Sequence, residues 1–134
     1  MRISGKKIIV IGGGIGGLAA ALALSRLGAA VTVLEQAAEI SDMGAGLQIS
    51  PNGFAVLDAL GLRDAVIDRS MAATSLVLRN YSDSATVATL DISTGKDGQN
   101  YYFIHRADLG ACLLSAARQT GVQVRLQHKV KQVQ

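Results

Sequence analysis

The fold of this chain is decided by the stretch Lys7-Ile8-Ile9-Val10-Ile11-Gly12-Gly13-Gly14-Ile15-Gly16-Gly17. Its β-prone apolar residues 8–11 predict a buried strand that ends in a glycine-rich turn. A helical stretch follows over residues 15–27, and Gly28 is a residue type that commonly terminates a helix. Because the helix begins inside the turn, the stretch predicts a strand–turn–helix unit.

The glycines of this stretch match the GxGxxG pattern of a dinucleotide-binding turn. Gly12, Gly14 and Gly17 fill its three positions, which provide a tight turn, room for a pyrophosphate, and close helix–strand packing. A helix that starts at Ile15 points free amide N–H groups and the positive end of its dipole at the ligand. Ile15 and Gly16 are therefore expected to bind the cofactor together with the three glycines.

An acidic residue follows the second predicted strand, residues 31–34. Glu35 lies 18 residues beyond Gly17, close to the roughly 20 expected for the acid that binds ribose hydroxyls. A carboxylate there accepts a hydrogen bond from the 2′-hydroxyl and repels a 2′-phosphate, so the sequence favours FAD or NAD over NADP. The alternative is that Glu35 is a solvated charge at a strand end.

The composition indicates one globular domain. The chain has 134 residues, 49% hydrophobic and 17% charged, with one proline, which argues against disorder. The net charge of +3 is small, and the basic residues near the end lack interleaved aromatic residues, so no nucleic-acid partner is expected. A single cysteine excludes an internal disulfide and suits a reducing compartment.

The uncharged run over residues 8–24 permits a second interpretation, as a signal peptide or short membrane span. Its glycines cluster at the motif spacing and would weaken a spanning helix, so we expect no membrane partner and a cytoplasmic location.

No cluster has metal-ligand spacing, so no metal is expected. Cys112 should be a buried, unreactive thiol, His105 structural and His128 solvated. Residues 94–97 lack the complete pattern of a phosphate loop.

The remaining sequence predicts an α/β fold, a Rossmann-like three-layer domain with an antiparallel β insertion. After an extended piece over 44–49, Ser50 as N-cap and Pro51 open a helix that Gly61 ends. We expect a shorter helix over 62–69 and then a hairpin of 75–81 and 86–91. A loop over 93–100 should lead to a strand over 101–104. A helix over 107–120 and a strand over 122–126 should follow, with further strand structure near the end. This divides the chain into a βαβ unit with its following helices (1–72), the insertion (73–104) and a returning helix and strand (105–134).

Three motifs, in this order, resemble the N-terminal part of single-component FAD-dependent aromatic hydroxylases. They are Gly12-Gly13-Gly14-Ile15-Gly16-Gly17-Leu18-Ala19-Ala20-Ala21 with Glu35-Gln36, then Gly44-Ala45-Gly46-Leu47-Gln48-Ile49-Ser50-Pro51-Asn52-Gly53, then His105-Arg106-Ala107-Asp108-Leu109. The similarity is greatest to salicylate, 3-hydroxybenzoate and 6-hydroxynicotinate hydroxylases. The first motif occurs in many flavoproteins, whereas the second and third are more specific.

The resemblance implies a set of FAD contacts. The glycine turn would hold the pyrophosphate, Glu35 would bind the adenosine ribose, and Gln36 beside it is counted with the cofactor-binding residues. Gln48 would lie near the flavin, Arg106 would reach phosphate or ribityl oxygens, and the backbone of Val130 would lie along the adenine. Such enzymes use NADH or NADPH as reductant, and O₂, to hydroxylate a small aromatic substrate.

The chain also departs from this family. Members are much longer, and the Asp-Gly and Gly-Asp motifs that follow in them are absent here. We therefore expect no catalytic residue in this chain, little activity from it alone, and possible association with a chain that supplies the missing portion. Two alternatives stay open: another FAD- or NAD-dependent oxidoreductase, and a truncated, non-catalytic nucleotide-binding module.

Overall fold

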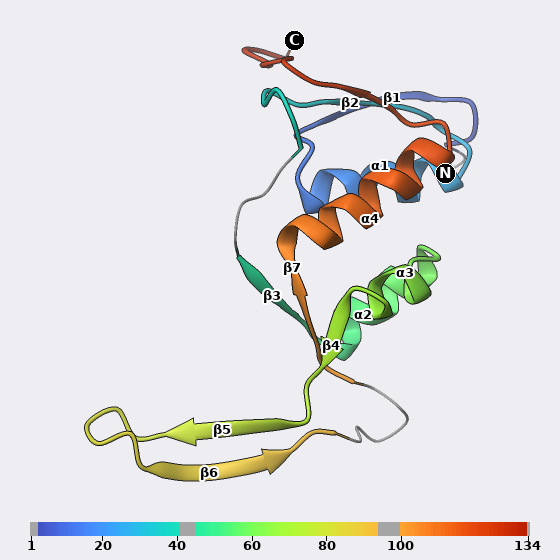
Figure 1. Ribbon diagram of the computed structural model, residues 1–134. Coiled ribbons are helices and arrows are strands. Elements are labelled where there is room, and N and C mark those ends of the chain that lie inside the picture. The colour runs from blue at the N-terminus through green and yellow to red at the C-terminus, as the bar shows by residue number, and fades with distance from the viewer. Residues whose placement is uncertain (1–2, 41–44, 94–99, 134) are drawn as a thin grey trace.

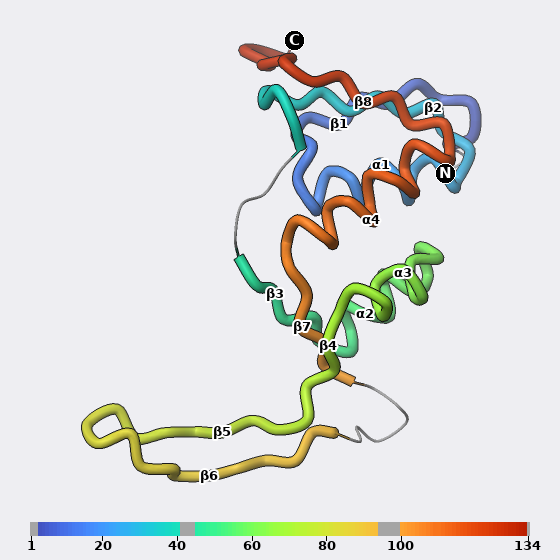
Figure 2. Tube along the Cα trace, in the orientation of Figure 1, coloured from blue at the N-terminus to red at the C-terminus, as the bar shows by residue number. Residues whose placement is uncertain are grey.

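The structure, a computed structural model, describes residues 3–40, 45–93 and 100–133. Its helices and strands form a parallel sheet with two helices, a small antiparallel sheet with two helices, and a separate hairpin (Figures 1 and 2). The hairpin lies at the far end of the molecule from the parallel sheet (Figure 1).

The parallel sheet contains β1 (Lys7–Ile11), β2 (Ala30–Leu34) and β8 (Gln123–Arg125), in the order β1-β2-β8. Two helices, α1 (Ile15–Arg26) and α4 (Arg106–Gln119), pack against each other and cover one face of it (Figure 1). The core between them is fully or nearly fully buried and consists of Leu18, Ala21, Leu22, Val31, Val33, Leu113, Ala117 and Val122. The predicted βαβ unit is confirmed, because β1, α1 and β2 form a parallel crossover.

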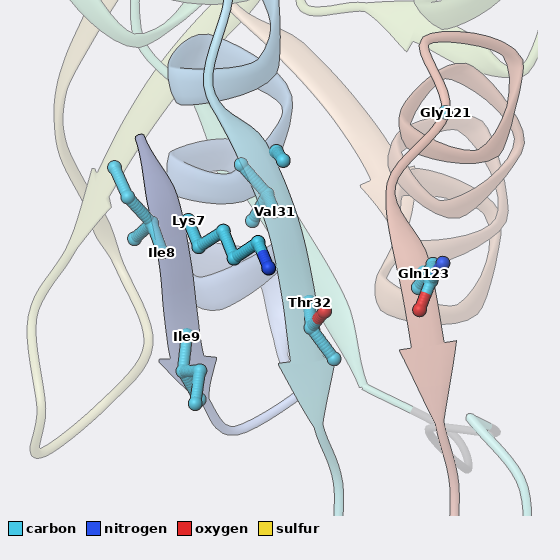
Figure 3. A pocket seen from close by; sticks show the side chains of 8 residues that line it. Lys7, Ile8, Ile9, Val31, Thr32, Gly121 and Gln123 are labelled. Atoms are coloured by element: carbon cyan, nitrogen blue, oxygen red, sulfur yellow. The ribbon is translucent and has the colours of Figure 1, made fainter. Parts of the chain in front are cut away.

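The other face of the parallel sheet is open within the described part of the chain. Ile9 is 65% exposed and Ile11 is 56% exposed, although both lie in β1. A cavity of about 400 Å³ lies over this sheet, and Figure 3 shows the side chains of β1, β2 and β8 that line it. It shares no residue with the glycine turn, so it is separate from the predicted cofactor site.

The small antiparallel sheet contains β3 (Gly46–Ile49), β7 (Tyr102–His105) and β4 (Ser70–Ala72), with β7 in the centre. Helices α2 (Pro51–Ala59) and α3 (Arg63–Ile67) connect β3 to β4. The sheet is anchored to α2 by the rings of Phe54 and Tyr102, which stack with their centroids 4.8 Å apart. The strand predicted over 101–104 is therefore present, and its partners are β3 and β4.

The predicted hairpin is confirmed as β5 (Ser75–Arg79) and β6 (Thr86–Asp91), which pair antiparallel with each other and with no other described strand. Every residue of β5 is exposed, and only one residue of β6 is partly buried. The division of the chain at residues 72 and 104 stays a prediction.

Helix ends follow the sequence signals closely. Gly28, Gly61 and Gly121 follow the C-caps of α1, α2 and α4, and each has a positive φ of 65–87°. Ser50 is the N-cap of α2, but its hydroxyl makes no capping bond and instead donates to Asn52 Oδ1 at 2.5 Å. Serine thus marks the helix start without satisfying a backbone amide.

Strand β4 was not predicted, and residues 126–133 contain no further strand after β8. Gly44, the excluded phosphate loop over 94–97 and the interior of the expected loop over 93–100 lie outside the described residues. Within the described ranges, no helix is long and apolar enough to cross a bilayer, and no group of three potential metal ligands occurs there.

Candidate functional site

The predicted site lies at the carboxyl end of the parallel sheet. Helix α1 begins where β1 ends, and α4 leads into β8, so both helices start at the edge where β1 and β2 finish (Figure 1). Open α/β sheets bind their ligands outside this edge. The topology therefore brings the glycine turn, the end of β2 and the segment after β8 to one place.

Gly12 and Gly17 are glycines because the fold requires them. Gly12 has a φ of +101°, which other residues rarely adopt, and its N–H donates to Leu34 O at 2.8 Å. A Cβ on Gly17 would overlap the Gly12 carbonyl oxygen. These two glycines let the chain reverse tightly and let α1 lie against the turn, as the motif predicts.

Gly14 and Gly16 are different, because their surroundings in the described chain do not require glycine. Gly14 has an ordinary φ of −71°, and a Cβ on either residue would have no described protein atom within 4 Å. The space beside them is open and lies at the N-terminus of α1. This end of the helix has no side-chain cap and no acidic residue in its first turn, so its amides and positive dipole suit a phosphate group. A pyrophosphate therefore fits these residues.

Glu35 is held by backbone amides on both carboxylate oxygens. Gly13 N–H donates to Glu35 Oε2 at 2.5 Å, and Ala37 N–H donates to Oε1 at 2.8 Å. The Ala37 bond and then the Gly13 bond lower the pKa of Glu35, against a smaller effect of burial. The carboxylate is thus ionised and fixed beside the glycine turn, with lone pairs remaining for further hydrogen bonds.

Four of the predicted residues line one cavity of about 210 Å³. Gly12, Glu35, Gln36 and Val130 contribute to its wall, and Ile11, Leu34, His128 and Lys129 complete it. Two backbone hydrogen bonds join the segment after β8 to the segment after β2, from Gln127 N–H to Ala37 O at 3.0 Å and from His128 N–H to Glu35 O at 2.8 Å. The structure therefore brings the segment after β8 against the segment after β2.

Gln48 and Arg106 do not line this cavity and lie on neighbouring elements, β3 and the start of α4. Gln48 is an exposed residue of β3 and pairs with Phe103 of β7, which continues directly into α4. Arg106 is the first residue of α4, and its N–H donates to Ala45 O at 2.9 Å. They form a second group, on the small sheet and the start of α4, that does not line the cavity at Glu35.

Sequence reasoning missed several residues of the site, among them Ile11 and Leu34 at the ends of β1 and β2. His128 and Lys129 line the cavity beside Val130, and their adjacency to Val130 was the available signal. His128 was expected to be solvated; it is exposed, and its Nδ1 lies 2.6 Å from Leu126 O. Gly13 occupies a position at which the motif accepts any residue, so only the structure reveals its bond to Glu35.

The expectation for Cys112 is supported by its surroundings. Its side chain is buried on α4, and its thiol lies 3.5 Å from Ala65 O. Burial raises the pKa of Cys112. A thiol that is protonated and shielded in this way is a poor nucleophile.

Comparison with known proteins gives a consistent result. A family model described as an FAD binding domain matches residues 6–134. The chain is 44% identical over 119 residues to a 3-hydroxybenzoate 6-hydroxylase of Polaromonas naphthalenivorans, covering 85% of this chain and 29% of that protein. It is 33% identical over 113 residues to a 6-hydroxynicotinate 3-monooxygenase of Pseudomonas fluorescens, covering 82% and 29%.

Solved structures support the same fold. The tetrameric form of 2-methyl-3-hydroxypyridine-5-carboxylic acid oxygenase superposes with a TM-score of 0.82 at 28% identity, covering 92% of this chain and 32% of that one. This bears out the Rossmann-like α/β class expected from the sequence. The chain spans about a third of the length of the relatives it matches.

Proposed function

Because this chain belongs to the family of FAD binding domains, we propose that it forms the FAD-binding part of a flavoprotein monooxygenase that hydroxylates a small aromatic acid. When bound, FAD supplies the redox chemistry, in which NADH or NADPH is the reductant and O₂ provides the oxygen atom. The residues of this chain bind and orient the cofactor, and none of them is assigned a catalytic role.

The observation that carries the proposal is the fixed carboxylate beside an open glycine turn. Gly14 and Gly16 leave space at the start of α1, and Glu35 stands at the edge of the adjoining cavity. In our proposal the amides of α1 bind the pyrophosphate and Glu35 accepts from the adenosine ribose. A fixed negative charge at that point disfavours a 2′-phosphate.

The other expected contacts complete the cofactor site in this proposal. Gln36 and the backbone of Val130 line the cavity with Glu35, and the adenine would lie along Val130. Gln48 and Arg106 would contact the flavin side, because they lie on the separate group formed by β3 and the start of α4. A guanidinium there suits phosphate or ribityl oxygens.

The substrate class is supported by the names of relatives. The two curated relatives above act on 3-hydroxybenzoate and 6-hydroxynicotinate, and the structural neighbour acts on a hydroxypyridine carboxylic acid. All are small aromatic acids that carry a ring oxygen substituent. We propose a substrate of this class for the enzyme to which this chain contributes its FAD-binding part.

Cofactor titration of the purified chain tests the proposal. Fluorescence titration should show FAD binding, and Glu35→Ala should weaken it about tenfold through a lost hydrogen bond to the ribose. Arg106→Ala should also weaken it. Asp83→Ala, which removes a carboxylate from the β5–β6 turn, should leave the affinity unchanged.

Other results would point elsewhere. Unchanged FAD affinity in both Glu35→Ala and Arg106→Ala would contradict the assigned site. A chain that binds NAD tightly and not FAD would indicate a different oxidoreductase, and a folded chain that binds neither would indicate a non-catalytic module.

A further inference from the structure

We propose that the open face of the parallel sheet, opposite α1 and α4, is a docking surface for the polypeptide that makes up the rest of an FAD-dependent aromatic hydroxylase. The partner that fits this face has an apolar surface bordered by acidic side chains. The inference rests on the proposed function, in which this chain supplies only the FAD-binding part of such an enzyme.

The centre of this face is apolar and exposed within the described part of the chain. Strand alternation places Ile9 and Ile11 of β1 on it, beside Thr32 and Leu34 of β2. Ile9 is 65% exposed and Ile11 is 56% exposed, and residues of β1, β2 and β8 line a cavity of about 400 Å³ (Figure 3). Parallel sheets occur almost only with both faces covered. The exposed isoleucines therefore mark a surface that a further layer should cover.

The charges on this face are all basic. The same alternation places Lys7 at the start of β1 and Arg125 at the end of β8 on the open face, and both residues are exposed. None of the three strands contains an acidic residue. Two copies of the chain stacked on this face would bring cations together without carboxylates to neutralise them. Charge complementarity therefore disfavours a second copy and favours a partner with an acidic border.

The relatives contain a large part that this chain lacks. The matched region makes up 29% of the 3-hydroxybenzoate 6-hydroxylase and 32% of the hydroxypyridine carboxylic acid oxygenase. The proposed function depends on that larger part, because no residue of this chain is assigned a catalytic role. The rest of such a protein is therefore the occupant that we assign to the open face.

Ile11 and Leu34 connect the docking surface to the cofactor site. Both lie on the open face at the carboxyl ends of their strands, and both line the cavity of about 210 Å³ that contains Glu35. A partner seated on them excludes water from that side of the cavity, which strengthens hydrogen bonds inside it. Docking should therefore raise the affinity for FAD, and FAD should raise the affinity for the partner by the same factor.

The main experiment uses the part of the Polaromonas naphthalenivorans hydroxylase that lies outside the matched region, co-expressed with the tagged full chain. The wild-type chain should retain this partner on purification, and its FAD affinity should rise about tenfold in the complex. Ile9→Asp places a charge in the apolar centre and should reduce retention at least tenfold. Val56→Asp places the same charge at a 58% exposed site on α2 and should leave retention unchanged.

The charge argument has its own variant. Lys7→Glu combined with Arg125→Glu should weaken retention and its dependence on salt, because both cations border the face. Circular dichroism checks that each variant is folded. Equal retention by the wild-type chain and Ile9→Asp, or no retention by the wild-type chain, would overturn the inference. A chain that binds FAD but not the partner would leave the proposed function intact, whereas a chain that retains the partner and never binds FAD would contradict that function.

Two measurements need no partner. Anilinonaphthalene sulfonate, an apolar anionic dye, should fluoresce with the wild-type chain, less with Ile9→Asp, and unchanged with Val56→Asp. A signal that does not respond to Ile9→Asp would show that the face is inaccessible. Analytical ultracentrifugation should find the chain monomeric at micromolar concentration, and a dimer that Ile9→Asp dissociates would assign the face to a second copy and overturn the inference.

Discussion

The parallel-sheet unit and the β5–β6 hairpin are stabilised in opposite ways. Residues of α1, β2 and α4 bury a shared core in which several side chains are fully inaccessible. The hairpin instead leaves its leucines between 45% and 52% exposed, and its strands pair only with each other among the described residues. An isolated two-stranded hairpin is marginally stable in water.

The comparison shows that the buried core and the glycine turn of the proposed cofactor site lie in the same part of this chain. The glycine turn and Glu35 are attached to elements with a buried core, so their geometry is enforced by packing. On the hairpin, Leu76 faces Leu90 and Leu78 faces Ala88, which leaves an apolar surface without a described covering element. Changes in the two regions should therefore have very different effects.

The largest contrast should come from the same substitution in each region. Leu22→Ala empties a site that is 0% exposed in α1, and should lower the free energy of unfolding by about 2–5 kcal/mol. Leu78→Ala removes the same atoms from a side chain that is 50% exposed, and should cost less than about 1 kcal/mol. Urea unfolding followed by circular dichroism measures both, and equal losses would contradict the comparison.

A smaller effect is expected within the glycine turn. Gly17→Ala places a methyl group against the Gly12 carbonyl oxygen, which should destabilise the chain by about 1–3 kcal/mol through the required backbone shift. Gly16→Ala adds the same group in open space and replaces glycine in a helix, so its stability should rise by up to about 1 kcal/mol. Thermal unfolding of the two variants measures the difference, and equal changes in melting temperature would contradict the contact assigned to Gly17.

The smallest effect concerns pH. The pKa of Glu35 is lowered by amides of Ala37 and Gly13, so its stabilising contribution is present above the pKa of the unfolded chain and is lost as the pH falls through the folded pKa. Glu35→Gln should therefore flatten the acid-side decrease in unfolding free energy.

The pKa of Asp91 is lowered by the hydroxyl and then the amide of Ser93, two residues away. Asp91→Asn should leave the acid-side slope unchanged, because this contact is local and exposed.

The fold could be predicted from sequence wherever the signal is local. The glycine turn, the positive-φ glycines that end helices, and the apolar face of α4 all depend on neighbours a few residues apart. Strand β4 was missed because three residues, Ser70–Ala72, carry no alternation. The central place of β7 was missed because pairing with β3 joins residues more than 50 positions apart.

The site shows the same division. The sequence identified Gly12, Glu35, Gln36 and Val130, and the structure places all four around one cavity. The sequence did not identify Gly13. Its amide can bond to the Glu35 carboxylate only because β2 pairs with β1 and places Glu35 beside the turn. Contacts that depend on two distant segments meeting leave no periodic pattern in the sequence.

Strand β7 ends at His105 and α4 begins at Arg106, with no loop between them. The small sheet and the helix that covers the parallel sheet are therefore joined by a stiff, continuous piece of backbone. A tilt of one sheet relative to the other must turn this helix, and its first residue is Arg106. A substitution at the Phe54–Tyr102 stack, which would loosen the small sheet, is therefore expected to change the position of Arg106.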